Sequence, residues 1–292
     1  MKRNAFATVL SVTVKILLVC VLAYCLYKLI PKLLEYKESD DAYKKIRSEA
    51  LKDPETEPET PRESVLSEAE ETETETETEK SDALRIDWEK FEGTDIVAWL
   101  ELDEISYPVL HSDSNQKYLH HLPDGTYNYG GSIFLYSQNS PLFTDEASFI
   151  YGHNMANGSM FGKLRRYSDS KYRDHCFYVY LPDGTRRTYR FYSVVSVPDG
   201  SAAYRWSFGS EDEFMEWQKM LMNGSMYSNS ATPSIDEKYV LLSTCHGPAG
   251  TSQRLLVIGQ YEDSEQIQEP ASWYEDYEEN IRLDEAIKKE SD

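Results

Sequence analysis

Hydrophobic and polar residues divide the chain into stretches of different character. An apolar run opens the chain, and a charged stretch and an acidic stretch almost free of apolar residues follow. Short apolar runs separated by turn residues come next, before a second acidic stretch. These patterns predict a cytoplasmic N-terminus (residues 1–4), a membrane span (5–30), a juxtamembrane helix (31–52), a disordered acidic linker (53–83), a folded domain (84–262) and an acidic tail (263–292).

The apolar run is long enough to cross a bilayer, which takes about 20 residues of helix. Lys15 interrupts it, and a lysine at the membrane centre costs about 2.5–3.5 kcal/mol. We therefore expect the span to settle towards Ile16–Ile30, with Lys15 and Lys28 reaching the two interfaces. A cleaved signal peptide is the alternative, with a candidate cleavage site at residues 21–23. The apolar run continues past that site, which favours a retained anchor.

The acidic linker has the sequence PETEPETPRESVLSEAEETETETETEKSD. It is of low complexity and has too few apolar residues to bury a core, so it is expected to be disordered. Its like charges repel one another and extend it. The sequence therefore predicts a solvated spacer between the membrane and the folded domain.

The folded domain is expected to be mostly β. Strand-like runs surround a turn at Leu102–Glu104, cover Ser132–Tyr136, and form a hairpin around the Pro-Asp-Gly at residues 182–184. GSMFGKLRRYSD and EDEFMEWQKMLM have helical spacing. Many short strands with few helices are typical of a closed or nearly closed β-barrel. The tail, with SWYEDYEENIRLDEAIKKESD, is expected to be a loosely docked helix or to be frayed.

Charge and cysteine usage narrow the function classes. The net charge is -21, which argues against nucleic acid as a partner because phosphate binding needs a basic surface. Two of the four cysteines lie in the apolar run, which leaves Cys176 and Cys245. Two cysteines do not make a disulfide scaffold. They either form a single pair, or one of them is a working thiol.

Cys245 is the candidate nucleophile, in LLSTCHGPAGTSQR. A thiol attacks as its thiolate and needs a partner that takes its proton. His153 is the best candidate, since it follows a strand and Gly152 at the start of a polar loop. His246 is adjacent to Cys245 and would point to the opposite face of an extended chain. The other histidines, with no such context, are His111, His120, His121 and His175, and we expect surface hydrogen bonds for His120 and His121.

Arg254 begins the apolar run RLLVIGQ, and a hairpin would bring it beside Cys245. Arginine stays protonated, so it can hold an anion or a developing oxyanion but cannot act as a base. An ordinary surface ion pair is the alternative for a strand-end arginine. Metal catalysis is not expected, because no histidine pair has the spacing of a metal-binding helix and no CxxC is present.

Together these residues resemble the class B sortases. SFIYGHNMANGSMFGKL is similar to their histidine segment, LLSTC to their cysteine motif and RLLVIGQ to their arginine strand. DIVAWLELDEISYPVL and NQKYLHHLPDGTYNYGGSIFLY also resemble that family, so the likeness covers Trp88 to Tyr261. It implies an eight-stranded sortase β-barrel with flanking helices. It also implies a cofactor-free, single-pass membrane enzyme whose catalytic domain faces outside a Gram-positive cell.

The resemblance also implies roles for individual residues. Cys245 would be the nucleophile, His153 the general acid and base, and Arg254 the residue that holds the oxyanion or the substrate. Thr244 and the backbone N–H of His246 would line the oxyanion site, with Ser243 and Asn154 in the pocket. The partners would be secreted proteins with a C-terminal sorting motif, led by asparagine or by serine and proline with threonine fourth, and an amine of the cell wall or of a pilin.

Two features depart from the family pattern. HGPAGTSQ lacks the aromatic residue expected soon after the cysteine, and the acidic linker is unexpected. Three alternatives remain. A cysteine peptidase would form the same acyl-enzyme and use water. An enzyme like the L,D-transpeptidases would have its histidine and cysteine close in sequence, whereas 92 residues separate His153 from Cys245. A non-enzymatic surface module would leave Cys245 as an inert thiol.

Overall fold

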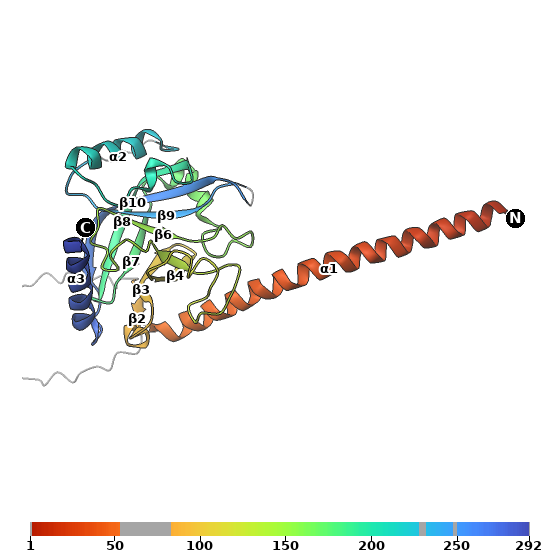
Figure 1. Ribbon diagram of the computed structural model, residues 1–292, viewed down its shortest axis with the longest axis horizontal. Helices are drawn as coiled ribbons and strands as arrows, with labels where there is room; N and C mark the ends of the chain where they lie inside the picture. The colour runs from red at the N-terminus through yellow and green to blue at the C-terminus, as the bar shows by residue number, and fades with distance from the viewer. Residues whose placement is uncertain (1, 53–82, 228–231, 248–249, 292) are drawn as a thin grey trace, which may run out of the picture.

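The computed structural model describes residues 2–52, 83–227, 232–247 and 250–291. Figure 1 shows a compact body from which one long helix projects. The body is a closed barrel with the strand order β10-β8-β7-β3-β4-β5-β6-β9. Its strands are β3 (Ile96–Leu102), β4 (Ile105–Leu110), β5 (Ile133–Leu135), β6 (Ala147–Tyr151), β7 (Cys176–Tyr180), β8 (Thr185–Pro198), β9 (Tyr239–Cys245) and β10 (Gln253–Gln266). The predicted eight-stranded, mostly β fold is thus confirmed.

Strand pairing and apolar side chains hold the barrel together. The β4–β5 and β6–β9 pairs are parallel, and the other neighbours are antiparallel. The inward side chains are completely buried, among them Leu100, Ile150, Leu242 and Val257. Burying one such side chain stabilises the fold by about 1.5–3 kcal/mol relative to its exposed state. The barrel therefore gives the strand ends a rigid base.

The predicted amphipathic helix is present as α2 (Glu211–Asn223). Ser210 caps it by accepting a hydrogen bond from the N–H of Glu213, and three acidic residues in its first turn face the positive end of the helix dipole. Its face with Phe214, Trp217 and Leu221 is buried in a second cluster outside the barrel. The helix therefore covers strands β8 and β9 with the apolar face that its sequence spacing predicted.

The helix predicted from GSMFGKLRRYSD is shorter than its pattern suggests. Only the 3-10 turns η2 (Leu164–Ser168) and η3 (Ser170–Tyr172) form there. Met160 has a φ of 50°, in the left-handed region, which ends regular helix on its N-terminal side. Met160, Phe161 and Leu164 are nevertheless all buried. The spacing of these apolar residues therefore reflects packing into the core and not a continuous helix.

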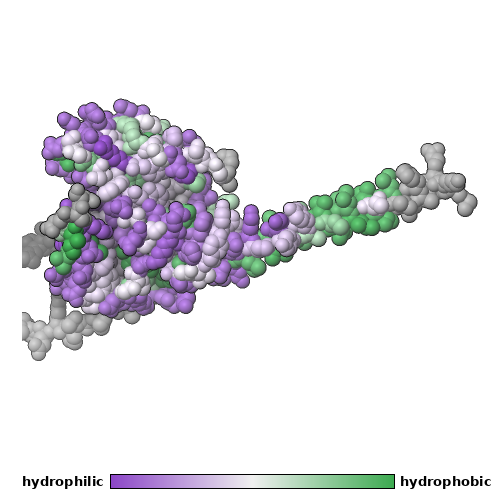
Figure 2. Space-filling model, viewed as in Figure 1, coloured by the Kyte–Doolittle hydropathy of each residue, from purple (hydrophilic) through white to green (hydrophobic). Residues whose placement is uncertain are grey.

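The N-terminal part of the chain forms one helix, α1 (Lys2–Ala50). The predicted membrane span and juxtamembrane helix are therefore continuous, and Pro31 lies inside the helix. The helix from Leu10 onwards is long and apolar enough to cross a membrane. Figure 2 shows this apolar band in green on the part of α1 that projects from the body, where Leu17 and Leu22 are exposed.

The end of α1 packs directly on the barrel. Tyr43 and Ala50 are buried, and β1 (Leu51–Lys52) pairs with β2 (Arg85–Ile86). The helix thus ends two residues before the predicted boundary at residue 52. The predicted acidic linker lies outside the described residues except for Ala83, and the two strands that flank it are the paired β1 and β2. This pairing concerns the flanking strands only, and the expectation of a solvated spacer stays a prediction.

The C-terminal tail extends the fold and is docked. Strand β10 continues to Gln266, past the predicted end of the domain at residue 262, and α3 (Tyr274–Ser291) follows. Between them Ile267 and Ala271 are buried. Trp273 donates to the carbonyl of Trp88, in the 3-10 turn η1 (Trp88–Phe91), over 3.2 Å. The tail therefore fastens the chain just after the linker to the barrel.

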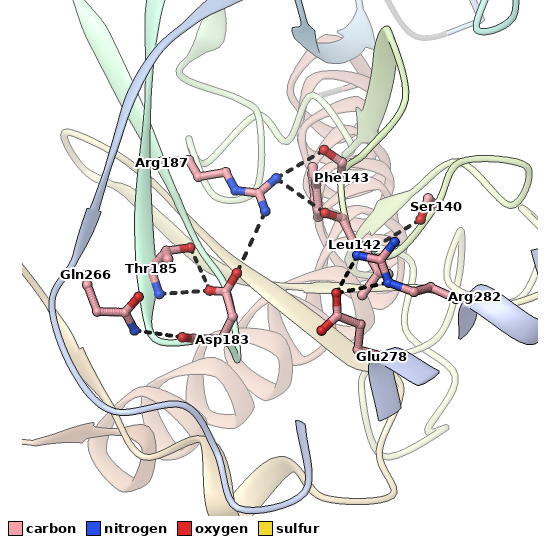
Figure 3. Close-up of polar contacts among 9 residues, drawn as sticks. All are labelled: Ser140, Leu142, Phe143, Asp183, Thr185, Arg187, Gln266, Glu278 and Arg282. Atoms are coloured by element: carbon pink, nitrogen blue, oxygen red, sulfur yellow. Dashed lines mark hydrogen bonds and ion pairs between the residues drawn. The ribbon is translucent and has the colours of Figure 1, made fainter. Parts of the chain in front are cut away.

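A polar cluster around Arg187 supports the part of the barrel next to α3 (Figure 3). The guanidinium of Arg187 donates to the carbonyls of Leu142 and Phe143 and lies 3.7 Å from Asp183. Asp183 is part of the confirmed β7–β8 hairpin, and Gln266 donates to its carbonyl. Arg187 thus ties the hairpin to the loop that precedes β6.

Candidate active site

Three neighbouring strands carry the predicted histidine, cysteine and arginine. In the parallel β6–β9 pair Tyr151 lies opposite Ser243, so His153 and Cys245 follow at equivalent places two residues later. In the antiparallel β9–β10 pair Arg254 lies directly opposite Cys245. Neighbouring strands are about 4.8 Å apart. The barrel therefore brings together three residues that are widely separated in sequence.

Two hydrogen bonds fasten the end of β6 to the end of β9. The hydroxyl of Thr244 donates to the carbonyl of Gly152 over 2.7 Å. The side-chain amide of Asn154 donates to the carbonyl of Cys245 over 2.9 Å. Gly152 is required here, because a Cβ at this position would lie 2.4 Å from a methyl carbon of Ile133. These contacts fix the backbones on both sides of the His153–Cys245 pair.

A pocket of about 320 Å³ opens at this end of the barrel. Its walls come from the loop after β4, from β5, from the ends of β6, β8 and β9, and from β10. The lining residues are Asn115, Gln116, Leu119, Phe134, Tyr151, Gly152, His153, Asp199, Ser243, Thr244, Cys245 and Arg254. The pocket therefore contains five of the seven predicted site residues, and its walls do not include Asn154 or His246.

His246 does not take the position expected of an oxyanion donor. Its backbone N–H donates to the carbonyl of Gln253 over 2.9 Å, because the β9–β10 ladder continues one residue beyond Cys245. Its ring lies 2.7 Å from the hydroxyl of Ser196. Ser243 lies in the pocket wall, where its hydroxyl is 2.7 Å from that of Tyr204.

His153 is held in one orientation. Its Nε2 lies 2.8 Å from the carbonyl oxygen of Leu119, and since a carbonyl can only accept, Nε2 carries the proton. In the neutral ring Nδ1 is then unprotonated and can accept a proton. Burial lowers the pKa of His153, and the neighbouring His120 lowers it further against the opposing effect of the Leu119 carbonyl. The neutral imidazole is therefore the favoured form near neutral pH.

Arg254 is both a pocket residue and a member of an ion pair. Its guanidinium lies 2.7 Å from the carboxylate of Asp199 and donates to the carbonyls of Thr251 and Gln253. Arg254 thus fits both interpretations of the sequence: it lines the pocket with Cys245, and it forms an ion pair at the end of its strand. Cys245 and Cys176 are both free thiols, which excludes a disulfide between them in this structure.

Comparison with known proteins identifies the family. The Sortase domain matches residues 101–262, which is more than half of the chain. The chain belongs to the sortase family. Sortase B of Listeria monocytogenes is 32% identical over 167 residues, which cover 56% of this chain and 68% of that protein. Sortase B of Staphylococcus aureus is 21% identical over 266 residues, 89% of this chain and 98% of that protein.

Solved structures show the same fold. The crystal structure of Staphylococcus aureus sortase B superposes with a TM-score of 0.56 at 22% identity, over 60% of this chain and 86% of that one. Sortase B from Listeria monocytogenes gives a TM-score of 0.50 at 27% identity, over 57% and 94%. Together with the Sortase domain and the 32% identity to sortase B of Listeria monocytogenes, these likenesses make the chain a class B sortase, and hence a cysteine transpeptidase.

The site of this sortase includes residues that the sequence did not point to. The rings of His120 and Tyr129 stack on His153, with centroids 5.4 and 5.8 Å away. The expected surface hydrogen bond is present for His121, whose Nδ1 lies 2.7 Å from the Lys117 carbonyl, but His120 belongs to the site. Asp199 lies in a turn with no distinguishing motif, and Leu119 contributes only a backbone oxygen. A side-chain pattern could not identify these two residues.

Proposed function

We propose that this sortase is anchored in the membrane by α1 and joins secreted proteins to an amine on the cell surface. Its substrates would carry a C-terminal sorting signal, and its acceptor would be an amine of the cell wall or of a pilin. The observation that supports this function is the placement of Cys245, His153 and Arg254 on adjacent strands around one pocket. A nucleophile, a base held by a third group and a fixed cation are the parts that acyl transfer through a thioester needs.

In the first half-reaction, Nδ1 of His153 takes the thiol proton and the Cys245 thiolate attacks the carbonyl carbon of the scissile peptide bond. The electron pair of that carbonyl moves to its oxygen, and Arg254 stabilises the resulting oxyanion. The tetrahedral intermediate collapses, the carbon–nitrogen bond breaks, and the imidazolium protonates the leaving amine. A thioester on Cys245 remains.

In the second half-reaction, the amine of the acceptor attacks the thioester. Neutral His153 takes a proton from the attacking nitrogen, and the intermediate expels the Cys245 thiolate. The product is a new amide bond, and the imidazolium returns its proton to the thiolate. The thioester keeps the free energy of the cleaved peptide bond, so the reaction needs no nucleotide.

Arg254 is the donor that can be made available to the oxyanion. The Thr244 hydroxyl and the His246 N–H already donate to backbone carbonyls of the fold. Arg254 pairs with Asp199, whose side chain is 59% exposed. An exposed ion pair contributes only about 0–1 kcal/mol, so a substrate oxygen can replace the carboxylate at little cost.

The position of α1 fits substrates that are themselves held at a membrane. Asn128, in the loop of residues 118–132, donates to the carbonyl of Glu35. Glu35 lies five residues beyond Ile30, the expected end of the span, or about 8 Å along a helix that rises 1.5 Å per residue. The same loop provides Leu119 to the pocket. We therefore place the pocket close to the outer face of the membrane.

The decisive experiment uses the full chain in detergent micelles with a panel of sorting-motif pentapeptides and an amine acceptor. Mass spectrometry should find an acyl adduct on Cys245 and an acceptor-dependent ligation product. Cys245→Ala and His153→Ala should each abolish both, whereas Cys176→Ala, the matched cysteine control, should keep them. An adduct that persists in Cys245→Ala would end the proposal, and cleavage that the acceptor never diverts would indicate a hydrolytic peptidase instead.

A further inference from the structure

The loop of residues 118–132 lies between His153 and α1. On the side of the site, its Leu119 carbonyl accepts the Nε2 proton of His153 over 2.8 Å. The rings of His120 and Tyr129 stack on the imidazole, with planes inclined by 20° and 19°. The orientation of His153 therefore depends on where this loop lies.

On its other side the loop is attached to α1 by buried groups. The hydroxyl of Tyr43 lies 3.1 Å from the Gly131 carbonyl and 2.9 Å from the hydroxyl of Ser132. The amide of Asn128 donates to the Glu35 carbonyl over 3.0 Å. Tyr43 and Asn128 are 7% and 1% exposed. Buried hydrogen bonds of this kind are costly to break because the groups would be left without water.

The two sides of the loop are closely packed against each other. The N–H of Ser132 donates to the carbonyl of Tyr118 over 2.9 Å, directly before Leu119. Gly131 has a φ of 52°, and a Cβ there would lie 2.3 Å from the Leu119 oxygen, the same oxygen that holds His153. The hydroxyl of Ser132 donates to the carbonyl of His121. A shift of Gly131 or Ser132 must therefore move the Leu119 carbonyl or open this contact.

We propose that Tyr43 of α1 is a positioning residue for His153 and acts through the loop of residues 118–132. The helix that carries the apolar span would then also set the orientation of the catalytic imidazole. This inference rests on the proposed role of His153 as acid and base. It goes beyond that role by assigning a function to the contact between α1 and the barrel.

A purely structural role for Tyr43 would give a different result, and Tyr192 provides the comparison. Tyr192 is also buried, but in the cluster under α2 and not in the cluster of Tyr43, and its hydroxyl donates to the Gln218 carbonyl. Tyr43→Phe and Tyr192→Phe each remove one buried hydroxyl and should lower the melting temperature of the full chain similarly. Only Tyr43→Phe should change the site.

The test measures both variants as full chains in detergent micelles. The first readout is the NMR titration of the His153 imidazole, assigned with His153→Gln, which needs no peptide substrate. Loosening the loop admits water to a ring whose pKa burial lowers, so Tyr43→Phe should raise its midpoint while Tyr192→Phe leaves it unchanged. The second readout is acyl transfer, where Tyr43→Phe should lower kcat about 10-fold with little change in KM.

The His153 titration tests the positioning role of Tyr43, and the peptide assay tests the proposed transpeptidase function. A His153 titration that moves in Tyr43→Phe alone supports positioning, even if no tested peptide is a substrate and the proposed function fails. An unchanged His153 titration in Tyr43→Phe, or equal changes in both variants, would overturn the inference whatever the activity.

Discussion

The guanidinium of Arg254 lies 2.7 Å from the carboxylate of Asp199, so the cation beside Cys245 is already held by an anion. Both residues line the same pocket. Arg254 is 22% exposed at its side chain and Asp199 is 59% exposed, so the arginine is the more firmly enclosed partner. The carboxylate therefore steadies the guanidinium in the free enzyme and can give way to a substrate oxygen.

Substitution of the two partners should have very unequal effects. Arg254→Ala should lower kcat/KM by about 100- to 1000-fold, the usual effect of removing an oxyanion donor. Arg254→Lys should also be severely impaired, because an ammonium does not replace the planar fork of donors. Asp199→Ala should change kcat/KM by about fivefold at most, since an exposed pair is worth about 0–1 kcal/mol. Steady-state kinetics on the full chain give kcat/KM for each variant. An equal loss of kcat/KM in Asp199→Ala and Arg254→Ala would mean that the intact ion pair, and not Arg254 alone, is needed for activity.

Gly152→Ala should damage the site from within the barrel. The added Cβ would lie 2.4 Å from Ile133 and 2.8 Å from Phe161, so the end of β6 must move. Overpacking of this kind costs about 1–3 kcal/mol, and displacement of His153 should lower kcat about 10- to 100-fold. Gly224→Ala is the matched control, since a Cβ there would meet its nearest neighbour at 3.4 Å. Thermal melts and kcat check both variants, and a fully active Gly152→Ala would show that His153 tolerates a shift of its strand.

The main features of the fold followed from side-chain patterns. Short apolar runs between turn residues marked the strands, and the spacing of Phe214, Trp217 and Leu221 marked the buried face of α2. Cys245, His153 and Arg254 stood out because each has a chemistry that few other residues supply, at the end of a strand. Strand pairing then placed them together in the structure.

Features made by the backbone and by tertiary contacts could not be predicted in this way. The carbonyl that orients His153 belongs to Leu119, whose side chain gives no indication of that role. The His246 N–H was expected to line the oxyanion site, yet in the structure it donates to Gln253 in the β9–β10 ladder. The acidic linker was interpreted by composition alone, which says nothing of the pairing of Leu51 with Ile86 in the strands that flank it.

The stacked His120 should tune the acid side of the pH–activity profile. Burial is the main cause of the lowered pKa of His153, and the neighbouring His120 lowers it further. His120→Phe keeps a ring in the stack and removes the second imidazole, so the pKa of His153 should rise. Because His153 must be neutral to accept the thiol proton, the acid limb of kcat/KM should move to higher pH. The profile is measured by peptide cleavage from pH 4 to 9.

His121→Phe is the control for this change. His121 is the adjacent histidine, but its Nδ1 contacts the Lys117 carbonyl and its ring packs on Tyr127. Its substitution should leave the acid limb in place. An acid limb that moves to lower pH in His120→Phe would contradict the assigned coupling between the two imidazoles.

Asp103 should contribute pH-dependent stability at the β3–β4 turn. Burial by itself raises the pKa of this carboxyl, but hydrogen bonds from Tyr167, His175 and Arg166 outweigh it and lower the pKa from 3.8 to about 2. A lowered carboxylate pKa stabilises the fold fully above the unfolded value near 4, and this contribution is lost as the pH falls towards 2. Asp103→Asn should therefore lower the free energy of unfolding at pH 7 by about 1–2 kcal/mol, a discounted value for a partly exposed charged group.

The asparagine variant isolates the charge from the backbone. Asp103 has a φ of 50°, and asparagine adopts this left-handed conformation as readily as aspartate does, so the substitution adds no strain. Glu104→Gln, at a neighbouring carboxylate whose side chain is 59% exposed, is the control and should change stability little. Urea unfolding followed by tryptophan fluorescence at pH 7 and pH 3 compares the three proteins. The deficit of Asp103→Asn should shrink at pH 3, and a deficit that is the same at both pH values would mean that the hydrogen-bond geometry matters rather than the charge.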